Sequence, residues 1–220
     1  EDAIKAAERP FVVIGRGAKS ARYEVWELIE RMGLPFGYTL KGKGILPDDH
    51  PQNLGPIGQH GGIGTNRVMS EADLVLCLGT NGDDRAFLNP EKFTQGKRAV
   101  INPYLVNAQA RLRIDYPIKA EADFTVAELL KSLDGDGQHQ RLRQWNEYAH
   151  RLVDAQPAYN QRNGGLSPVD AISDVVSSMD IDISILDVGE HQMHGMKEKI
   201  LRLGVYKRGE IYGNTPLELR

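Results

Sequence analysis

Short, largely apolar runs alternate with stretches of helical periodicity along the first 133 residues. Runs that end at glycine or another turn residue predict buried strands, which we place at residues 11–14, 35–40, 72–78 and 98–101. Because strands and helices alternate, the pattern predicts an α/β fold with a doubly wound, largely parallel six-stranded sheet. Ligands of such a sheet bind beyond the carboxyl ends of its strands.

The predicted helices each carry apolar residues on one face. The first follows the strand at 11–14 and has Ser20 as its N-cap and Gly33 as its terminator. Two more helices are predicted at residues 61–70 and 124–133. The apolar face of the first helix consists of Ala21, Val25, Leu28, Ile29 and Met32.

A change of pattern after residue 133 divides the chain. Residues 134–137, Asp-Gly-Asp-Gly, are typical of a linker, so we predict a first domain over residues 1–133 and a connecting helix and linker over residues 134–165. The alternation restarts at Ser167-Pro168, an N-cap followed by a first-turn proline, and continues with a strand at 183–188. Residues 166–220 are expected to form an incomplete second α/β domain.

The composition is typical of a globular protein and argues against a nucleic-acid-binding or membrane-spanning one. Apolar residues make up 40% and charged residues 26%, as in ordinary globular proteins, and a net charge of −3 argues against nucleic-acid binding. No run approaches the about 20 apolar residues of a membrane span, so we expect a cytoplasmic protein without a membrane partner. Cys77 lies in an apolar run, which predicts a buried thiol. Glu1 lies in a helical pattern without an initiator Met, so we expect further sequence upstream.

Three glycine-rich segments are candidates for ligand contacts: two follow predicted strands, and the third, residues 58–64, directly precedes a predicted helix. The first, Gly15 to Ser20, partly matches the dinucleotide-binding fingerprint, but Ser20 replaces the third glycine and the next strand lacks an acidic residue for a ribose. Two interpretations remain open, a nucleotide contact and a tight turn of purely structural origin. Segments 58–64 and 79–85 present the same choice between a ligand-binding and a structural turn.

The sequence assigns no catalytic residue and no metal site. Glu190, His191 and His194 cluster after the last predicted strand, but two histidines need further ligands, and none is identifiable elsewhere. A P-loop, a nucleophile elbow and a Ser/His/Asp set are also missing from the sequence.

Taken in order, several segments resemble the central domain of thiamin-diphosphate-dependent enzymes, most closely the acetolactate synthase branch. The resemblance covers residues 1 to about 133, through the segments 9–18, 42–51, 58–61, 72–76 and 79–85. Residues 187–193 resemble the first strand of the family's diphosphate-binding domain. The first domain is therefore expected to be a nucleotide-binding-like central domain, and residues 166–220 part of the thiamin-diphosphate-binding domain.

The resemblance implies a carboligase or decarboxylase that releases carbon dioxide from a small 2-oxo acid, uses thiamin diphosphate with Mg²⁺, and forms a homodimer or homotetramer. It also implies FAD, an adenine nucleotide or no ligand in the central domain. The positions that match the nucleotide groove are Gly15, Arg16, Gly17, Thr39, Leu40, Gly58, Gln59, His60, Gly79, Asp83, Arg85, Glu121 and Ala122. Those that match the diphosphate site are Gly189, Glu190, His191 and Gln192, and those that match a substrate or lid segment are Met196 and Ile200.

The chain departs from the family pattern at several points. Glu190 stands where the family has Gln, and Asn81 stands where it has an Arg that contacts flavin. The family's activating Glu belongs to an amino-terminal domain that is not part of these residues, and its metal motif does not follow His194. We therefore expect the 220 residues alone to be inactive. We also expect a break between His194 and Gly195, with Cα atoms much farther apart than about 3.8 Å. A continuous peptide bond there would instead favour a true deletion and a noncatalytic protein.

Two alternatives remain open. One is a noncatalytic nucleotide-binding or regulatory module of the same fold that pairs with another chain, which the intact mass of the native protein would distinguish from a parent enzyme. The other is an NAD-consuming enzyme of the same fold, for which His60 is the one candidate to face a nicotinamide.

Overall fold

The structure of the chain is a computed structural model. It describes residues 1–59, 61–82, 87, 95–109, 112–133, 138–155, 171, 178, 184–186, 203–207 and 210–213.

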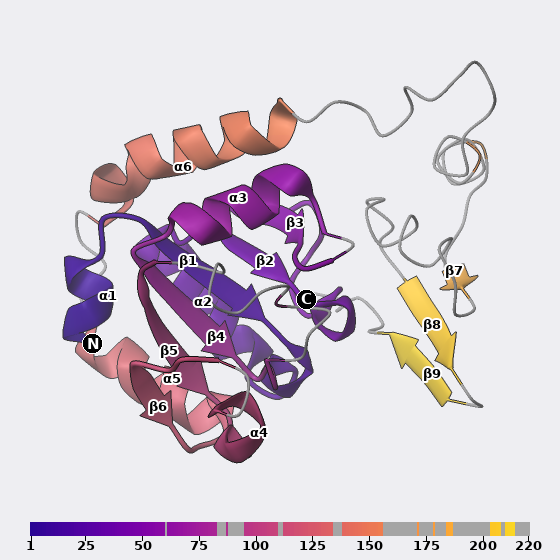
Figure 1. The fold of residues 1–220 in the computed structure, drawn as a ribbon, viewed down its shortest axis with the longest axis horizontal. Coiled ribbons are helices and arrows are strands. Elements are labelled where there is room, and N and C mark those ends of the chain that lie inside the picture. Colours follow the sequence, from indigo (N-terminus) through magenta and orange to yellow (C-terminus); the bar gives the residue numbers. More distant parts are fainter. Residues whose placement is uncertain are drawn as a thin grey trace.

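Six parallel strands form the first sheet, in the order β3-β2-β1-β4-β5-β6 (Figure 1). The prediction of a doubly wound, six-stranded sheet is confirmed, and within it every neighbouring pair is parallel. The strands are β1 (Pro10–Ile14), β2 (Phe36–Tyr38), β3 (Asn53–Pro56), β4 (Leu74–Leu78), β5 (Lys97–Ile101) and β6 (Tyr116–Ile118).

Helices cover both faces of this sheet. The helices are α1 (Asp2–Ala6), α2 (Arg22–Met32), α3 (Ile63–Glu71), α4 (Leu105–Gln109), α5 (Ala122–Ser132) and α6 (Gln138–Asp154), with the 3₁₀ turns η1 (Arg16–Ala18) and η2 (Leu40–Gly42). Residues of α1, α2 and α5 pack in one hydrophobic cluster, whereas residues of α3, α4 and most of the buried face of α6 pack in a second. In Figure 1, α3 and α6 accordingly lie on the same side of the sheet.

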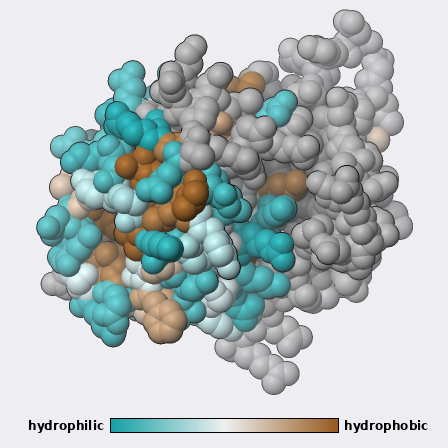
Figure 2. Space-filling model, turned by 60° about the horizontal axis from the view of Figure 1, so that its bottom comes forward, coloured by the Kyte–Doolittle hydropathy of each residue, from teal (hydrophilic) through white to brown (hydrophobic). Residues whose placement is uncertain are grey.

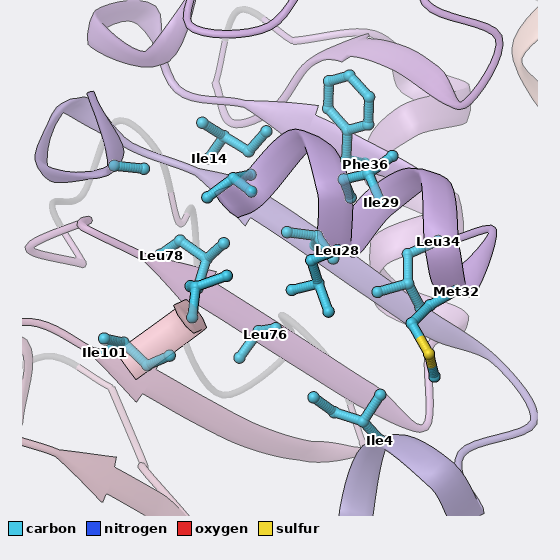
Figure 3. Packing of buried hydrophobic residues seen from close by; sticks show 14 of the residues in the cluster. Ile4, Ile14, Leu28, Ile29, Met32, Leu34, Phe36, Leu76, Leu78 and Ile101 are labelled. Atoms are coloured by element: carbon cyan, nitrogen blue, oxygen red, sulfur yellow. The ribbon is translucent and has the colours of Figure 1, made fainter. Parts of the chain in front are cut away.

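The alternation of side chains along β1 explains why both faces are apolar. Val12 and Ile14 point into the first cluster, and Phe11 and Val13 point into the second. Figure 3 shows the first cluster, in which Leu28 and other α2 side chains meet those of the strands. Cys77 lies fully buried in the second cluster as a free thiol, as predicted, and burial raises its pKa to about 12.

The start of α2 differs from the prediction. Gly33 ends the helix with a φ of 64°, as expected for a left-handed terminator, but Ala21 and not Ser20 is the N-cap. After η1 the chain makes one more tight turn, in which the Ala21 N–H donates to the Ala18 carbonyl at 3.1 Å. Ala18 and Ala21 are both buried, so packing of these small residues sets where the helix begins.

Helix α6 is attached to the first sheet by side chains that bond to distant backbone carbonyls. The Trp145 indole donates to Pro10 at 2.8 Å, the Asn146 amide to Gly33 at 2.9 Å, and Arg141 to Ala7 at 2.5 Å. The domain boundaries at residues 134 and 166 stay a prediction. What the structure adds is that the helix of the predicted connecting segment packs on the first domain.

A second, three-stranded sheet contains β7 (Ser184–Leu186), β8 (Leu203–Lys207) and β9 (Glu210–Gly213). Strand β8 pairs in parallel with β7 and antiparallel with β9. The expected break between residues 194 and 195 lies outside the described residues. Among the helices that the structure describes, none is both long and apolar enough to cross a membrane.

Candidate functional site

The strand order places a topological switch point between β1 and β4. From there the chain builds the sheet outward in two directions, through β2 and β3 on one side and through β5 and β6 on the other. The loops that leave the carboxyl ends of β1 and β4 therefore lead to opposite halves of the sheet. In open α/β sheets this is the place where ligands bind.

The glycines at the switch point bring two backbones into contact. The Gly15 N–H donates to the Leu78 carbonyl at 2.8 Å, and the Gly17 N–H donates to the Gly79 carbonyl at 2.9 Å. A Cβ atom at Gly15 would lie 2.6 Å from the Gly79 oxygen, closer than real side chains allow. Close packing of η1 against the loop after β4 thus explains these glycines.

This packing constrains how the turn after β1 could hold an anion. The N–H groups of Gly15, Gly17 and Ala18 all donate to carbonyl groups of the protein, so they are not arranged as a phosphate cradle. Positive charge comes instead from the exposed side chains of Arg16 on η1 and Lys41 on η2, two turns that contact each other. At this edge, charged side chains rather than a glycine-rich backbone cradle are the groups suited to contact an anion.

A third turn, after β3, contributes Gly58 and the exposed Gln59. Both hydrogen-bonding groups of the Gly58 backbone are bonded to the side chain of Asn66 on α3, each at 2.8 Å. Sequence reasoning missed Asn66 because nothing in the periodicity of α3 reveals a contact made with a glycine eight residues earlier.

The carboxyl ends of β4 and β5 are linked by Asn102, a second residue that sequence reasoning missed. Its buried amide donates to the Thr80 carbonyl and to Asn81 Oδ1, both at 2.9 Å, and its Oδ1 accepts the Tyr104 N–H at 2.7 Å. Asn81, which is predicted from the sequence to stand in place of a family Arg, is thus held by Asn102.

Exposed apolar side chains gather at the same end of the sheet. Every large apolar residue that is exposed in the described part of the chain lies at the start of a helix that follows a strand: Tyr23, Ile63, Tyr104, Val106 and Phe124. Tyr104 is 71% and Phe124 75% exposed. Figure 2 shows apolar surface on the face formed by the lower elements of Figure 1, which include α4 and α5. Aromatic rings at this edge are suited to stack on a planar ligand.

A buried ion pair links two residues of the segment between β2 and β3. Lys43 Nζ lies 2.6 Å from Asp48 Oδ2, and these side chains are only 4% and 6% exposed. The ammonium also donates to the Tyr38 hydroxyl at 3.4 Å. Burial, and secondarily the Asp48 charge, raise the pKa of Tyr38 far above its usual value, so this hydroxyl stays protonated.

The structure brings many of the predicted groove residues to one edge of the sheet. Those found in the loops or helix starts after the carboxyl ends of the strands are Gly15, Arg16, Gly17, Thr39, Leu40, Gly58, Gln59, Gly79, Glu121 and Ala122. Those that lie outside the described residues are His60, Asp83, Arg85, Gly189, Glu190, His191, Gln192, Met196 and Ile200. Their assignment to ligands stays a prediction. Within the described residues, no group of three His, Cys, Asp or Glu could hold a metal ion.

Comparison with known proteins identifies similar sequences. Over 195 residues the chain is 33% identical to the acetolactate synthase isozyme 1 large subunit of Escherichia coli (strain K12). The matched region covers 86% of this chain and 34% of that relative. It is 26% identical over 211 residues to a probable acetolactate synthase large subunit of Methanococcus aeolicus, with 86% and 35% covered. The chain thus spans about a third of the length of these relatives.

A known protein family matches most of the predicted first domain, residues 1–133. Residues 1–129 match the family described as "Thiamine pyrophosphate enzyme, central domain". This range contains all six strands of the parallel sheet. The resemblance seen in the glycine-rich segments is therefore confirmed. The chain belongs to the thiamine pyrophosphate enzyme family, whose central domain it contains.

Proposed function

We propose that the chain is part of a cytoplasmic, thiamin-diphosphate-dependent 2-oxo acid carboligase or decarboxylase that resembles acetolactate synthase and acts as a homodimer or homotetramer. The observation that carries the proposal is the similarity to acetolactate synthase large subunits over 86% of the chain. Thiamin diphosphate with Mg²⁺ would supply the electron sink for decarboxylation. Residues 189–192, which resemble the family's diphosphate-binding stretch, are the ones that would hold it.

For the central domain, we propose that the carboxyl edge of the sheet binds FAD or an adenine nucleotide. Support comes from the switch point between β1 and β4, the exposed cations Arg16 and Lys41, and the exposed aromatic rings of Tyr104 and Phe124. The cations would attract the diphosphate, and a ring would stack on the adenine or the flavin. In this role the chain binds and orients a ligand.

The nucleotide proposal is tested by titrating the purified chain with FAD and with ADP. We expect saturable binding that the Arg16→Ala variant weakens by about tenfold, because a charge-assisted contact to the diphosphate is lost. Isothermal titration calorimetry measures both ligands, and flavin fluorescence checks FAD. Arg143→Ala, which removes an exposed cation from α6, is the matched control and should bind like the unaltered chain. Failure of both ligands to bind would overturn the nucleotide proposal.

The decarboxylase proposal leads to an expected result for the chain by itself. A protein of only these 220 residues should release no carbon dioxide from pyruvate with thiamin diphosphate and Mg²⁺ added, because its sequence contains neither the activating Glu nor the metal motif of the family. Carbon dioxide release is measured with a coupled assay. Steady turnover by a preparation of verified mass would contradict this expectation.

The alternative is a noncatalytic module that pairs with another chain. The intact mass of the native protein separates the two proposals, since a parent enzyme should be about as long as the relatives, of which these residues span about a third. A native protein of this length that co-purifies with a second chain would favour the module.

A further inference from the structure

The carboxamide of Asn66 forms two hydrogen bonds with a single residue. The Gly58 N–H donates to Asn66 Oδ1, and Asn66 Nδ2 donates to the Gly58 carbonyl, both at 2.8 Å. A donor and an acceptor on one residue fix which end of the amide carries the nitrogen. The contact has the pattern of a pair of bonded residues on two antiparallel strands, with the side chain in place of one backbone.

The turn that this contact holds needs an external tie. Gly58 adopts a φ of 94°, a conformation that glycine enters without steric cost, and two more glycines follow at positions 61 and 62. Such a segment has many conformations in the absence of restraints. The Gly61 N–H donates to the Gly58 carbonyl at 3.0 Å, so the carbonyl bonded by Asn66 is also the acceptor that closes the turn.

Stabilisation of α3 itself does not account for this side chain. Asn is a poorer helix former than Ala or Leu, and the N-cap of α3 is Gly62, without a side-chain cap. The helix is anchored by other residues: the Thr65 hydroxyl donates to the Leu54 carbonyl, and Val68 is fully buried. The side-chain bonds of Asn66 therefore act on the turn after β3.

We propose that Asn66 is a positioning residue of the nucleotide edge, which fixes the turn after β3 so that Gly58 and the exposed Gln59 face the ligand in one conformation. The inference rests on the proposed nucleotide site and assigns a residue that shapes one of its walls. A turn fixed before binding loses less conformational entropy when the ligand arrives, so it binds more tightly than a turn that must be ordered.

Two substitutions test the inference. Asn66→Asp keeps the acceptor for the Gly58 N–H but places a carboxylate oxygen against the Gly58 carbonyl, and Asn66→Ala removes both bonds. Both are expected to weaken binding of FAD or ADP by at least about tenfold. Val68→Ala is the control, because it removes core packing from the same helix without touching Gly58. It should lower the melting temperature but leave affinity within about twofold at temperatures where all the variants are folded.

A second measurement tests the tie without any ligand. In protein labelled with ¹⁵N-glycine, the amide protons of Gly58 and Gly61 should lose protection from hydrogen exchange in the Asn66 variants and keep it in Val68→Ala. Ligand binding that Asn66→Asp and Asn66→Ala leave within about twofold would overturn the inference but not the nucleotide proposal. If the unaltered chain bound neither ligand, the nucleotide proposal would fail. Unchanged exchange at Gly58 would then show that Asn66 does not hold the turn either.

Discussion

Replacement of Gly79 by alanine is expected to destabilise the first domain by more than about 4 kcal/mol, which is among the largest effects of a single substitution. Gly79 has a φ of 63°, and an added Cβ would fall on the backbone of Gly17 and Ala18, well inside van der Waals contact. Because the clashing atoms belong to the backbone, no side-chain rotation relieves the overlap. Urea unfolding of the full chain, followed by far-UV circular dichroism, measures the loss.

Gly55→Ala is a matched control for this substitution. Gly55 also has a positive φ, of 92°, but the nearest atom to an added Cβ is Thr65 Oγ1 at 3.9 Å, an ordinary contact. Its alanine variant should lose only the conformational advantage of glycine, about 1 to 2 kcal/mol. The difference between the variants then reports the packing of η1 against the loop after β4. Equal losses would contradict the importance of this packing.

The central strands could be predicted because burial on both faces leaves a clear mark on sequence. Strands β1 and β4 lie in the middle of the sheet and consist almost entirely of apolar residues, so their runs were recognised. Strand β3, Asn-Leu-Gly-Pro, is an edge strand with alternating burial and contains a glycine and a proline. Strand β6 is the other edge and has only three residues, with Pro117 at its centre. Such strands lack the apolar run, so neither was located from the sequence.

The candidate site was predictable in its glycines but not in its polar supports. Gly15 and Gly79 stand out because they follow apolar runs, and Gly58 because it opens a stretch with four glycines in seven residues. The structure places all three beyond the carboxyl ends of strands. What each glycine does depends on a partner that is remote in the sequence: Gly15 contacts Gly79, and Gly58 bonds to Asn66. Asn102 likewise bonds to a residue 22 positions away. Contacts of this kind follow from the fold and leave no periodic signal.

Replacement of Lys43 by methionine is expected to destabilise the domain by about 3 to 5 kcal/mol, because it leaves the Asp48 carboxylate buried without its cation. The two side chains are almost completely inaccessible, so water cannot take over the lost contact. The pair also joins the residue after η2 to the chain before β3. Its loss therefore affects the segment that carries Thr39 and Leu40, two of the proposed groove residues.

The double variant Lys43→Met/Asp48→Leu separates the energy of the pair from the cost of an unpaired charge. If the charges are needed only to neutralise each other, apolar replacements of both residues should unfold at a higher urea concentration than Lys43→Met alone. The Tyr38 hydroxyl loses its Lys43 contact in both proteins, so this change cancels in the comparison. A double variant that is less stable than Lys43→Met would show that Asp48 stabilises the fold through contacts other than this ion pair. Urea unfolding of the three proteins at one pH provides the comparison.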